Sequence, residues 1–235
     1  MVHIPAFFVQ SFPVLRYCGT THCVMAKQLP LFPLQIVAYP GERVNLHIFE
    51  ERYRELVRHM EKEGAAFGIP TVIDGGLRPV ATELELIEVA NRYPGGECDI
   101  RVRGTGIVRI REFYDKAWGQ GYPGGLVNEL EYETREDLSL NRSILEHTQE
   151  IYSRLNIERE VPTDLIAFRT YDIAHYIGFT LAQEYEFLTL FKARDRQEYM
   201  LEHLRNLRPD VSAHQRLRER AKLNGHFREL QPPNF

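Results

Sequence analysis

The spacing of apolar residues changes once along this chain, at about residue 135. Before that point apolar and polar residues alternate in short segments, which turns containing glycine and proline separate. This pattern is typical of the strands of a small barrel or sandwich. After that point apolar residues recur every three or four positions, as they do in amphipathic helices. The sequence therefore predicts an α+β fold, with a β-barrel subdomain in residues 29–135 and a helical subdomain in residues 136–223.

The segment LPLFPLQIVAYPGERVNLHIFEERYREL, residues 29–56, combines both patterns. Leu34–Tyr39 is apolar enough for a buried strand, and Pro40-Gly41 suits the centre of a type II turn. Alternation then predicts a half-exposed strand over residues 44–48. A helix is predicted to follow, with one apolar stripe formed by Phe49, Tyr53, Leu56, Val57 and Met60. Gly64 is expected to end this helix.

Five more strands are predicted in the β-rich half, over residues 67–73, 80–93, 97–104, 105–113 and 126–133. The glycine-rich loop before the last strand carries the only tryptophan. A small barrel with short turns accounts for strands at this spacing.

Five helices are predicted in the second half. Three lie over residues 140–155, 163–178 and 180–191, the fourth contains Leu201, Leu204 and Leu207, and the fifth lies over residues 210–223. We expect Ser139 to cap the first helix and Thr163 the second, because hydroxyl side chains accept hydrogen bonds from free N–H groups there. Thr180 and Gln183 have the spacing of a capping box for the third.

Residues 1–28 differ from the rest of the chain. The apolar stretch Ile4–Leu15 contains two prolines and no basic residue precedes it, so it does not fit a secretory signal. It is also too short to span a bilayer, and we predict no membrane association. We expect a disordered or mis-annotated extension, with Met25 as the natural start, and a short tail over residues 224–235.

The three cysteines, Cys18, Cys23 and Cys98, are too few and too uneven in number for a disulfide framework. This usage suits a reducing compartment, and we expect a cytoplasmic protein. Cys18, His22 and Cys23 are close enough to suggest zinc, but no second cluster completes a site. We therefore predict no metal and no cofactor.

The formal net charge of −4 is unevenly distributed. Residues 29–191 carry 17 basic and 27 acidic side chains, whereas residues 192–222 carry nine and five. Arginines 101, 103, 109 and 111 alternate along two predicted strands, where they could grip RNA phosphates or form a solvated face that Glu97, Asp99 and Glu112 balance. The acidic β-rich half favours the solvated face, because nucleic acid binding depends on excess positive charge.

Several segments of this chain resemble one known family. The 29–56 segment resembles the opening signature of the Lon amino-terminal substrate-binding domain, the LON domain, and FGIP, ELIEV and GGECDIRVRGTGIVRIREF are similar to its later strands. AHYIGFTLAQEYEFLTLFKARDRQEYMLEHL is similar to its closing helices, so the resemblance extends over residues 29–207. The chain differs in having Ala38-Tyr39 where the family usually has a more aliphatic pair, and in its longer WGQGYPGG loop. Both differences could alter a binding surface.

The resemblance implies a PUA-like β pseudo-barrel packed on a small helical bundle. It also implies binding of unfolded or extended polypeptide, as an adaptor or substrate selector for proteolysis with a protease or ATPase as partner. The alternative is an RNA or nucleotide-type ligand bound by the PUA-like barrel, although nucleic acid is the less favoured ligand. The oligomeric state does not follow from these residues.

The residues of the Lon ATPase and protease chemistry are absent from this sequence. A phosphate-binding P-loop needs glycine followed by lysine, and no glycine in this chain precedes a lysine. A Ser-Lys dyad needs an activated serine, but the five serines lie near the two ends of the chain or in and beside one predicted helix. The chain also ends soon after the helical half. We therefore predict a non-catalytic protein.

Five aromatic residues at strand ends and on loops have no core position assigned by periodicity: Phe32, Tyr39, Tyr93, Trp118 and Tyr122. Aromatic side chains in such places are good candidates for binding anchors. We predict a hydrophobic groove, lined by some of these five, that holds an extended peptide. The alternative is that Trp118 plugs the mouth of the barrel.

Overall fold

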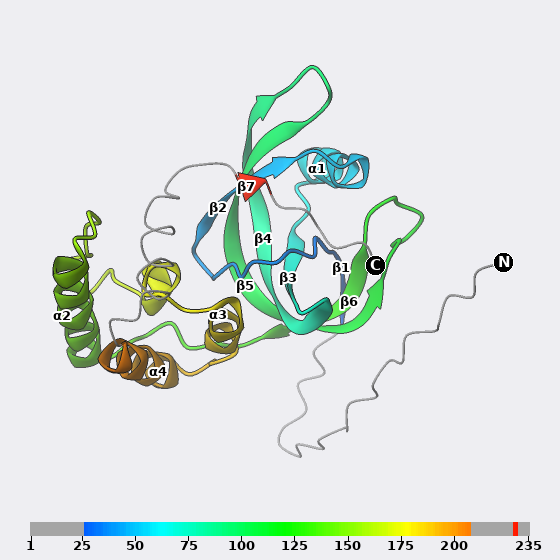
Figure 1. Ribbon diagram of the computed structural model, residues 1–235. Coiled ribbons are helices and arrows are strands. Elements are labelled where there is room, and N and C mark those ends of the chain that lie inside the picture. Colours follow the sequence, from blue (N-terminus) through cyan, green and yellow to red (C-terminus); the bar gives the residue numbers. More distant parts are fainter. Residues whose placement is uncertain (1–25, 208–227, 230–235) are drawn as a thin grey trace, which may run out of the picture.

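The computed structural model describes residues 26–207 and 228–229. It has two halves, a strongly curved sheet with one helix beside it and a group of helices next to that sheet (Figure 1). The predicted α+β fold, with the strands before the helices, is confirmed. Lys27 and Gln28, which we placed in the N-terminal extension, belong to the first strand, and residues 1–25 lie outside the described residues.

The strands are β1 (Lys27–Pro30), β2 (Arg43–Ile48), β3 (Phe67–Ile73), β4 (Gly76–Arg92), β5 (Cys98–Tyr114), β6 (Gly124–Leu130) and β7 (Arg228–Glu229). β5 pairs with β4 along residues 98–109. On its other side the first part of β5 pairs with β2 and the last part pairs with β6. β3 extends the sheet beyond β4, and β1 extends it beyond β6, all antiparallel. β7 adds a short parallel pair to β2.

The segment after β1 closes the curved sheet into a barrel. Leu31 donates a backbone hydrogen bond to the end of the loop before β6, and Leu31 and Leu34 form isolated bridges with β3. The predicted strand over Leu34–Tyr39 is therefore wrong, although its apolar side chains are buried as expected. Proline supplies no N–H group, and Pro33 lies between the two bridging residues, where it interrupts any continuous ladder.

Residues 97–104 and 105–113, predicted as two strands, form the single strand β5. The Pro40-Gly41 turn packs on its middle: Gly41 N–H donates to Gly104 O at 2.9 Å, and Gly104 N–H donates to Glu42 O at 2.9 Å. The turn itself is as predicted, with Glu42 N–H bonded to Tyr39 O and a positive φ of 85° at Gly41.

Helix α1 (Glu51–Glu63) covers one end of the barrel (Figure 1). Its buried residues are Tyr53, Leu56, Val57 and Met60, which confirms most of the predicted stripe, and Phe49 lies half-buried before it. Gly64 ends the helix as predicted, with a φ of 63° that glycine adopts at little cost.

The remaining helices are α2 (Leu138–Leu155), α3 (Leu181–Leu188) and α4 (Ala193–Asn206), with two 3₁₀ turns at Thr170–Asp172 and Ala174–Tyr176. The predicted helix over residues 163–178 is therefore wrong. Asp164 accepts hydrogen bonds from the N–H groups of Ile166 and Ala167, and such local side-chain bonds compete with helix formation.

The predicted caps had mixed outcomes. Asp137, rather than Ser139, caps α2, because its carboxylate accepts from Ser139 N–H at 2.8 Å and Leu140 N–H at 3.1 Å. The capping box of Thr180 and Gln183 at α3 is confirmed. The fifth predicted helix lies outside the described residues.

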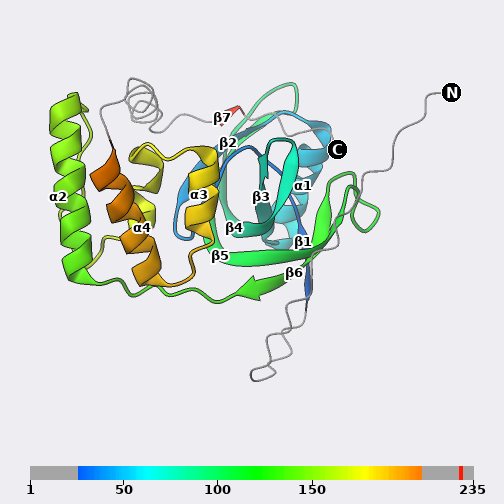
Figure 2. The same cartoon turned by 60° about the horizontal axis from the view of Figure 1, so that its bottom comes forward.

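The described residues form three hydrophobic clusters: one inside the barrel, one that includes residues of the barrel and of the helices, and a small one around Leu31 and Val108. Figure 2 shows the helices packed beside the barrel. Tyr39 joins them: its ring stacks on Tyr171 with centroids 5.0 Å apart, and its hydroxyl donates to Glu184 O. Tyr185 contributes a second link by accepting from Val80 N–H. Within the described part of the chain, none of the helices has the length and apolar run that crossing a membrane requires.

Candidate functional site

A groove of about 470 Å³ lies between the end of α1 and the second half of β4. We define this α1–β4 groove by the residues that line it: Met60, Glu61, Gly64, Ala65, Glu85, Leu86, Ile87, Glu88 and Val89. Met60 is buried, and Leu86 and Val89 are half-buried against the barrel core, so the floor is apolar. Ile87 is 46% exposed, an unusual position for a large apolar side chain.

The strand lengths create this groove. β3 begins at Phe67, which pairs with Leu84, so β4 continues past its neighbour as one arm of a hairpin with β5. Only three small residues, Gly64, Ala65 and Ala66, lie between the end of α1 and the start of β3. The space that β3 would occupy beside Glu85–Arg92 is therefore open along part of the strand.

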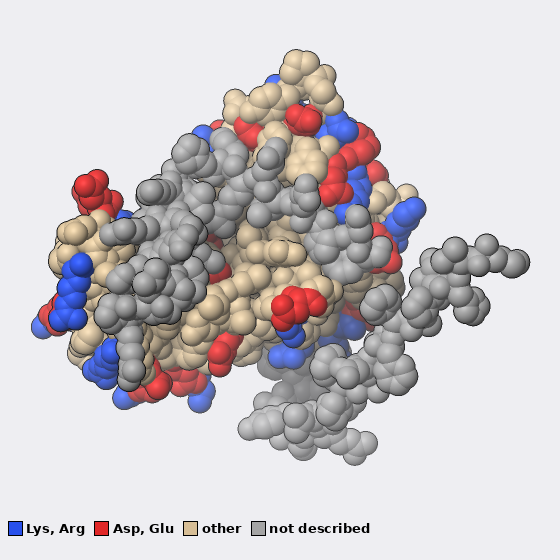
Figure 3. All heavy atoms as spheres, in the orientation of Figure 1, with Lys and Arg blue, Asp and Glu red and all other residues tan. Residues whose placement is uncertain are grey.

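Three ion pairs surround the groove and leave its rim without excess charge. Glu61 pairs with Arg92 at 2.5 Å, Glu85 pairs with Arg103 at 2.5 Å, and Glu88 pairs with Arg101. On the face shown in Figure 3, acidic and basic side chains are likewise interspersed rather than segregated. Exposed pairs of this kind contribute about 0–1 kcal/mol each to stability, so their main consequence is a neutral rim.

These pairs also bear on whether the alternating arginines of β5 bind RNA phosphates or form a solvated face. Arg101 and Arg103 lie on the solvated face of β5 as favoured, but their partners are acids of β4 rather than the predicted Glu97, Asp99 and Glu112. Guanidinium groups already held by carboxylates are poorly placed to neutralise phosphates.

Of the five predicted anchors, Tyr93 and Trp118 are the exposed ones, at 42% and 40%. Phe32, Tyr39 and Tyr122 are core residues instead, and their prediction as surface anchors is corrected on that ground. Phe32 packs on Tyr53 with ring centroids 4.0 Å apart, Tyr39 joins the two halves, and Tyr122 is fully buried with its hydroxyl bonded to His59. Prolines and glycines beside an aromatic residue therefore did not indicate exposure.

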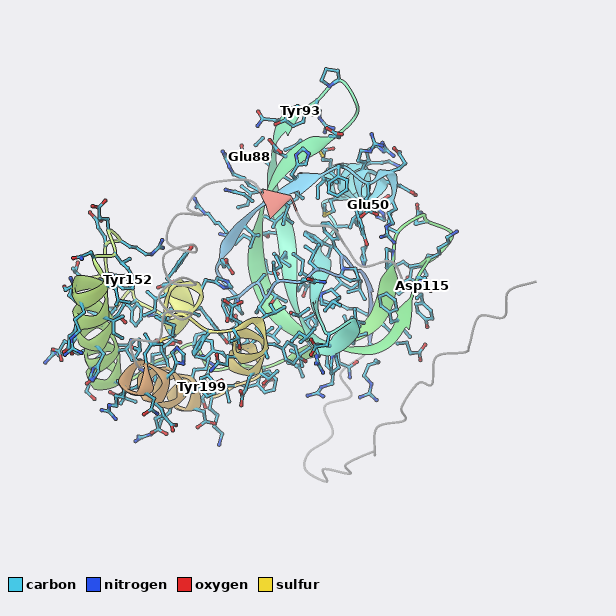
Figure 4. The ribbon with its side chains drawn as sticks, in the orientation of Figure 1. Glu50, Glu88, Tyr93, Asp115, Tyr152 and Tyr199 are labelled. Carbon is cyan, nitrogen blue, oxygen red and sulfur yellow. The ribbon has the colours of Figure 1, made fainter. Side chains whose placement is uncertain are left out.

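Tyr93 and Trp118 lie on loops that flank α1. Arg54 of α1 donates to Gly95 O in the β4–β5 hairpin, and Glu55 accepts from Gly121 N–H in the β5–β6 loop. Figure 4 shows Tyr93 on the hairpin and Asp115 on the other loop, with Glu50 at the start of α1 between them. The two exposed aromatics therefore do not form one common anchor.

Trp118 rests against the barrel rim. A β-carbon added at Gly124 would lie 2.7 Å from the Trp118 ring, so the ring covers that glycine closely. This contact is compatible with a ring that closes the barrel mouth, while its exposed part remains available to a ligand.

Tyr93 belongs to a polar cluster at the base of the hairpin. Its hydroxyl donates to Asp99 Oδ2 at 2.7 Å, Asn91 donates to the same oxygen at 2.9 Å, and His47 Nδ1 lies 2.7 Å from Asp99 Oδ1. Burial alone would raise the pKa of Asp99, but these hydrogen bonds together outweigh burial and lower it. The hydrogen bond to the Asp99 carboxylate in turn raises the pKa of Tyr93. The cluster fixes the hairpin that carries β4 past the groove.

Replacing Asp99 with asparagine is expected to flatten the acid dependence of stability. The pKa of Asp99 is lower in the folded state, so ionised Asp99 stabilises the fold above the ordinary carboxyl pKa of about 4. That contribution is lost as the pH falls through the lowered folded pKa. Urea unfolding across this acidic range measures the effect, with exposed Asp115→Asn as the control. A stability difference between wild type and Asp99→Asn that is the same at every pH would contradict this assignment.

A smaller cavity, of about 240 Å³, lies where the Pro40-Gly41 turn meets the helical half. His175 Nδ1 lies 2.9 Å from Glu184 and its Nε2 lies 3.2 Å from Glu42, so the ring bridges two carboxylates from different halves. This arrangement ties the barrel to the helices. The described residues contain no group of three or more side chains suited to hold a metal ion.

The groove residues were missed at the sequence level, although a signal was present. In ELELIEVANRY the alternation breaks at Leu86-Ile87, where two apolar residues are adjacent. The structure has a register shift between Leu86 and Glu88, and such bulges re-aim side chains. The break in alternation therefore marks the exposed Ile87.

Comparisons with known protein families and solved structures identify relatives of this chain. Residues 28–206 match the family model of the ATP-dependent protease La (LON) substrate-binding domain. The structure is similar to that of a Lon N-terminal domain protein from Xanthomonas campestris, with 25% identity, a TM-score of 0.58, and coverage of 75% of this chain and 98% of that chain.

A second solved structure, the N-terminal domain of a Mycobacterium avium complex Lon protease, shares the fold. Its TM-score is 0.57 at 15% identity, with coverage of 77% of this chain and 100% of that one. The search of curated proteins gave no match. Because the family match extends over more than half of the chain, the protein belongs to the LON substrate-binding domain family.

Proposed function

We propose that this protein binds unfolded or extended polypeptide in the α1–β4 groove and carries out no catalysis itself. Membership of the LON substrate-binding domain family supports the class of ligand. The location of the proposed binding site rests on one observation, the open groove with its apolar floor, exposed isoleucine and neutral rim. A groove with these properties suits apolar side chains of many sequences and makes no demand for one charge.

The proposed role is that of an adaptor or substrate selector that presents bound polypeptide to a protease or ATPase partner in the cytoplasm. The family match extends over the substrate-binding domain, and no glycine of the chain precedes a lysine to form a P-loop. Both observations support a binding role without ATP hydrolysis or proteolysis.

The nucleic acid alternative has weaker support. Arg101 and Arg103 are engaged with acids of β4, and residues 29–191 carry more acidic than basic side chains. Binding of phosphates by this half would have to break those pairs first.

Ile87→Asp is expected to lower the affinity for fluorescently labelled casein at least about tenfold, the equivalent of 1.4 kcal/mol. The substitution places a charge in the groove where an apolar side chain would make contact. Fluorescence anisotropy titration measures the affinity, and a thermal melt verifies that the variant remains folded.

Ile166→Asp is the matched control, because Ile166 is 74% exposed in the helical half. It should leave casein affinity unchanged. Equal losses in both variants, or none in either, would exclude the groove as the binding site. Casein binding by wild type should also persist at raised salt, since apolar contact is not screened as phosphate contacts are.

A further inference from the structure

The open edge of β4 has a second property besides the groove beside it. Over Glu85–Arg92 the strand pairs with β5 on one side, and no other described strand pairs with it. Strand edges expose rows of backbone donors and acceptors that another extended chain can pair with. Such an edge therefore recognises the backbone of a ligand and not only its side chains.

The hydrogen-bond pattern identifies which backbone groups face the open side. Gly104 of β5 exchanges hydrogen bonds with the turn before β2. In an antiparallel strand the N–H and C=O groups of successive residues point to opposite sides. The backbone groups of Arg103 therefore point toward β4, where Arg103 is paired with Glu85. The next β4 residue, Leu86, consequently directs its N–H and C=O away from β5.

The same alternation applies further along the hairpin. Ile100 pairs with Leu46 of β2 and, on the other side, with Val89 of β4. It lies four positions before Gly104, so its backbone groups also face β2. Val89 therefore directs its N–H and C=O to the open side, as Leu86 does. Both residues line the groove, so these backbone groups, which no other described strand pairs with, lie together with the apolar floor.

We propose that polypeptide binds here by strand addition: an extended segment pairs with Leu86 and Val89 at the β4 edge and places alternate apolar side chains in the α1–β4 groove. The proposal rests on the proposed polypeptide-binding function and specifies its mode. A strand added to an edge lies about 4.8 Å from it, and the α1–β4 groove is lined by the residues of this edge. Strand addition derives affinity from main-chain hydrogen bonds and therefore tolerates many sequences.

The occupant that fits is a flexible, unfolded segment rather than a second copy of this edge. The β4 strand has register shifts between Leu86 and Glu88 and between Val89 and Asn91. Bulges of this kind hinder the pairing of two rigid edges, whereas an unfolded peptide adjusts its backbone to them. The neutral rim of ion pairs requires no particular charge in the peptide.

Peptides methylated on backbone nitrogen test this mode with the unmodified full-length protein. The probe is a fluorescent peptide in which valine alternates with threonine and lysine, and two derivatives carry N-methyl groups on all valines or on all the other residues. In an extended strand each set directs its N–H groups to one side. Strand addition predicts that one derivative loses at least about tenfold in affinity while the other stays within about threefold.

Equal effects of the two derivatives would overturn strand addition, as would failure of the unmethylated peptide to compete with casein. In both cases casein binding sensitive to Ile87→Asp would leave the proposed function intact. Absence of casein binding by the wild type would overturn both. A concentration-dependent dimer that excludes the peptide would assign the edge to a second copy and contradict the proposal.

Discussion

Replacing Leu56 with alanine is expected to lower the free energy of unfolding by about 2–5 kcal/mol, the range for truncating a buried leucine. Leu56 is 1% exposed and lies in the barrel core with Tyr53, Val57 and Met60 of the same helix. Its removal leaves a cavity between α1 and the sheet, because close-packed neighbours relax only in part. Urea denaturation monitored by circular dichroism measures the change.

Leu138→Ala is the control, since Leu138 is 50% exposed at the start of α2. It should change stability by less than about 0.5 kcal/mol. A cost below about 1 kcal/mol at Leu56 would show that α1 is loosely held, and α1 could not then serve as a fixed wall of the groove.

Replacing Gly104 with alanine is expected to destabilise the protein by about 3 kcal/mol, the upper part of the range for overpacking. A β-carbon at this position would overlap the carbonyl oxygen of Tyr39 and lie 3.0 Å from its carbonyl carbon. The obstructing atoms are backbone, so the Pro40-Gly41 turn must move and its hydrogen bonds to β5 must lengthen.

Gly106→Ala provides the matched control two residues along the same strand. No atom lies within 4 Å of a β-carbon added at Gly106. Its stability should be unchanged or raised by up to about 1 kcal/mol, because alanine restricts the unfolded chain. Comparable losses at both glycines would contradict the close approach of the turn to Gly104.

The regular elements could be predicted because their apolar periods are continuous. The stripe of α1 and the alternation of β2 each follow from one local geometry. The alternation was confirmed, and so was the stripe apart from Phe49. The segment Leu34–Tyr39 is as apolar as a strand, yet prolines and its path across the barrel allow only isolated bridges. The apolar composition of this segment therefore predicts that its side chains are buried, but it does not predict which backbone hydrogen bonds form.

The helical half illustrates a second limit of local patterns. Residues 163–178 have apolar spacing compatible with a helix, but tertiary contacts hold them as turns. Thr170, for example, donates its N–H and hydroxyl to the buried carboxylate of Glu136. A partner 34 positions away in the chain cannot be recognised from the spacing around Thr170.

The candidate site was harder to predict, because exposure depends on neighbours that are distant in sequence. Tyr39 follows an apolar segment and precedes a turn, but the helices cover it. Ile87 is exposed at a register shift between Leu86 and Glu88, in the part of β4 that continues past the last pair with β3 at Leu84. Register is set by the pairing of whole strands. The cover over Tyr39 therefore does not follow from the residues around it, whereas the break in alternation at Leu86-Ile87 is a local sign of the exposed Ile87.

Amide hydrogen exchange with and without the valine–threonine peptide tests the central claim most directly. Bound peptide should protect the amides of Leu86 and Val89, whose N–H groups face the open edge, and leave the exchange of Ile166 and its neighbours unchanged. Protection confined to the β5–β6 loop around Trp118, or to the cavity at His175, with no change at Leu86 and Val89, would contradict the account.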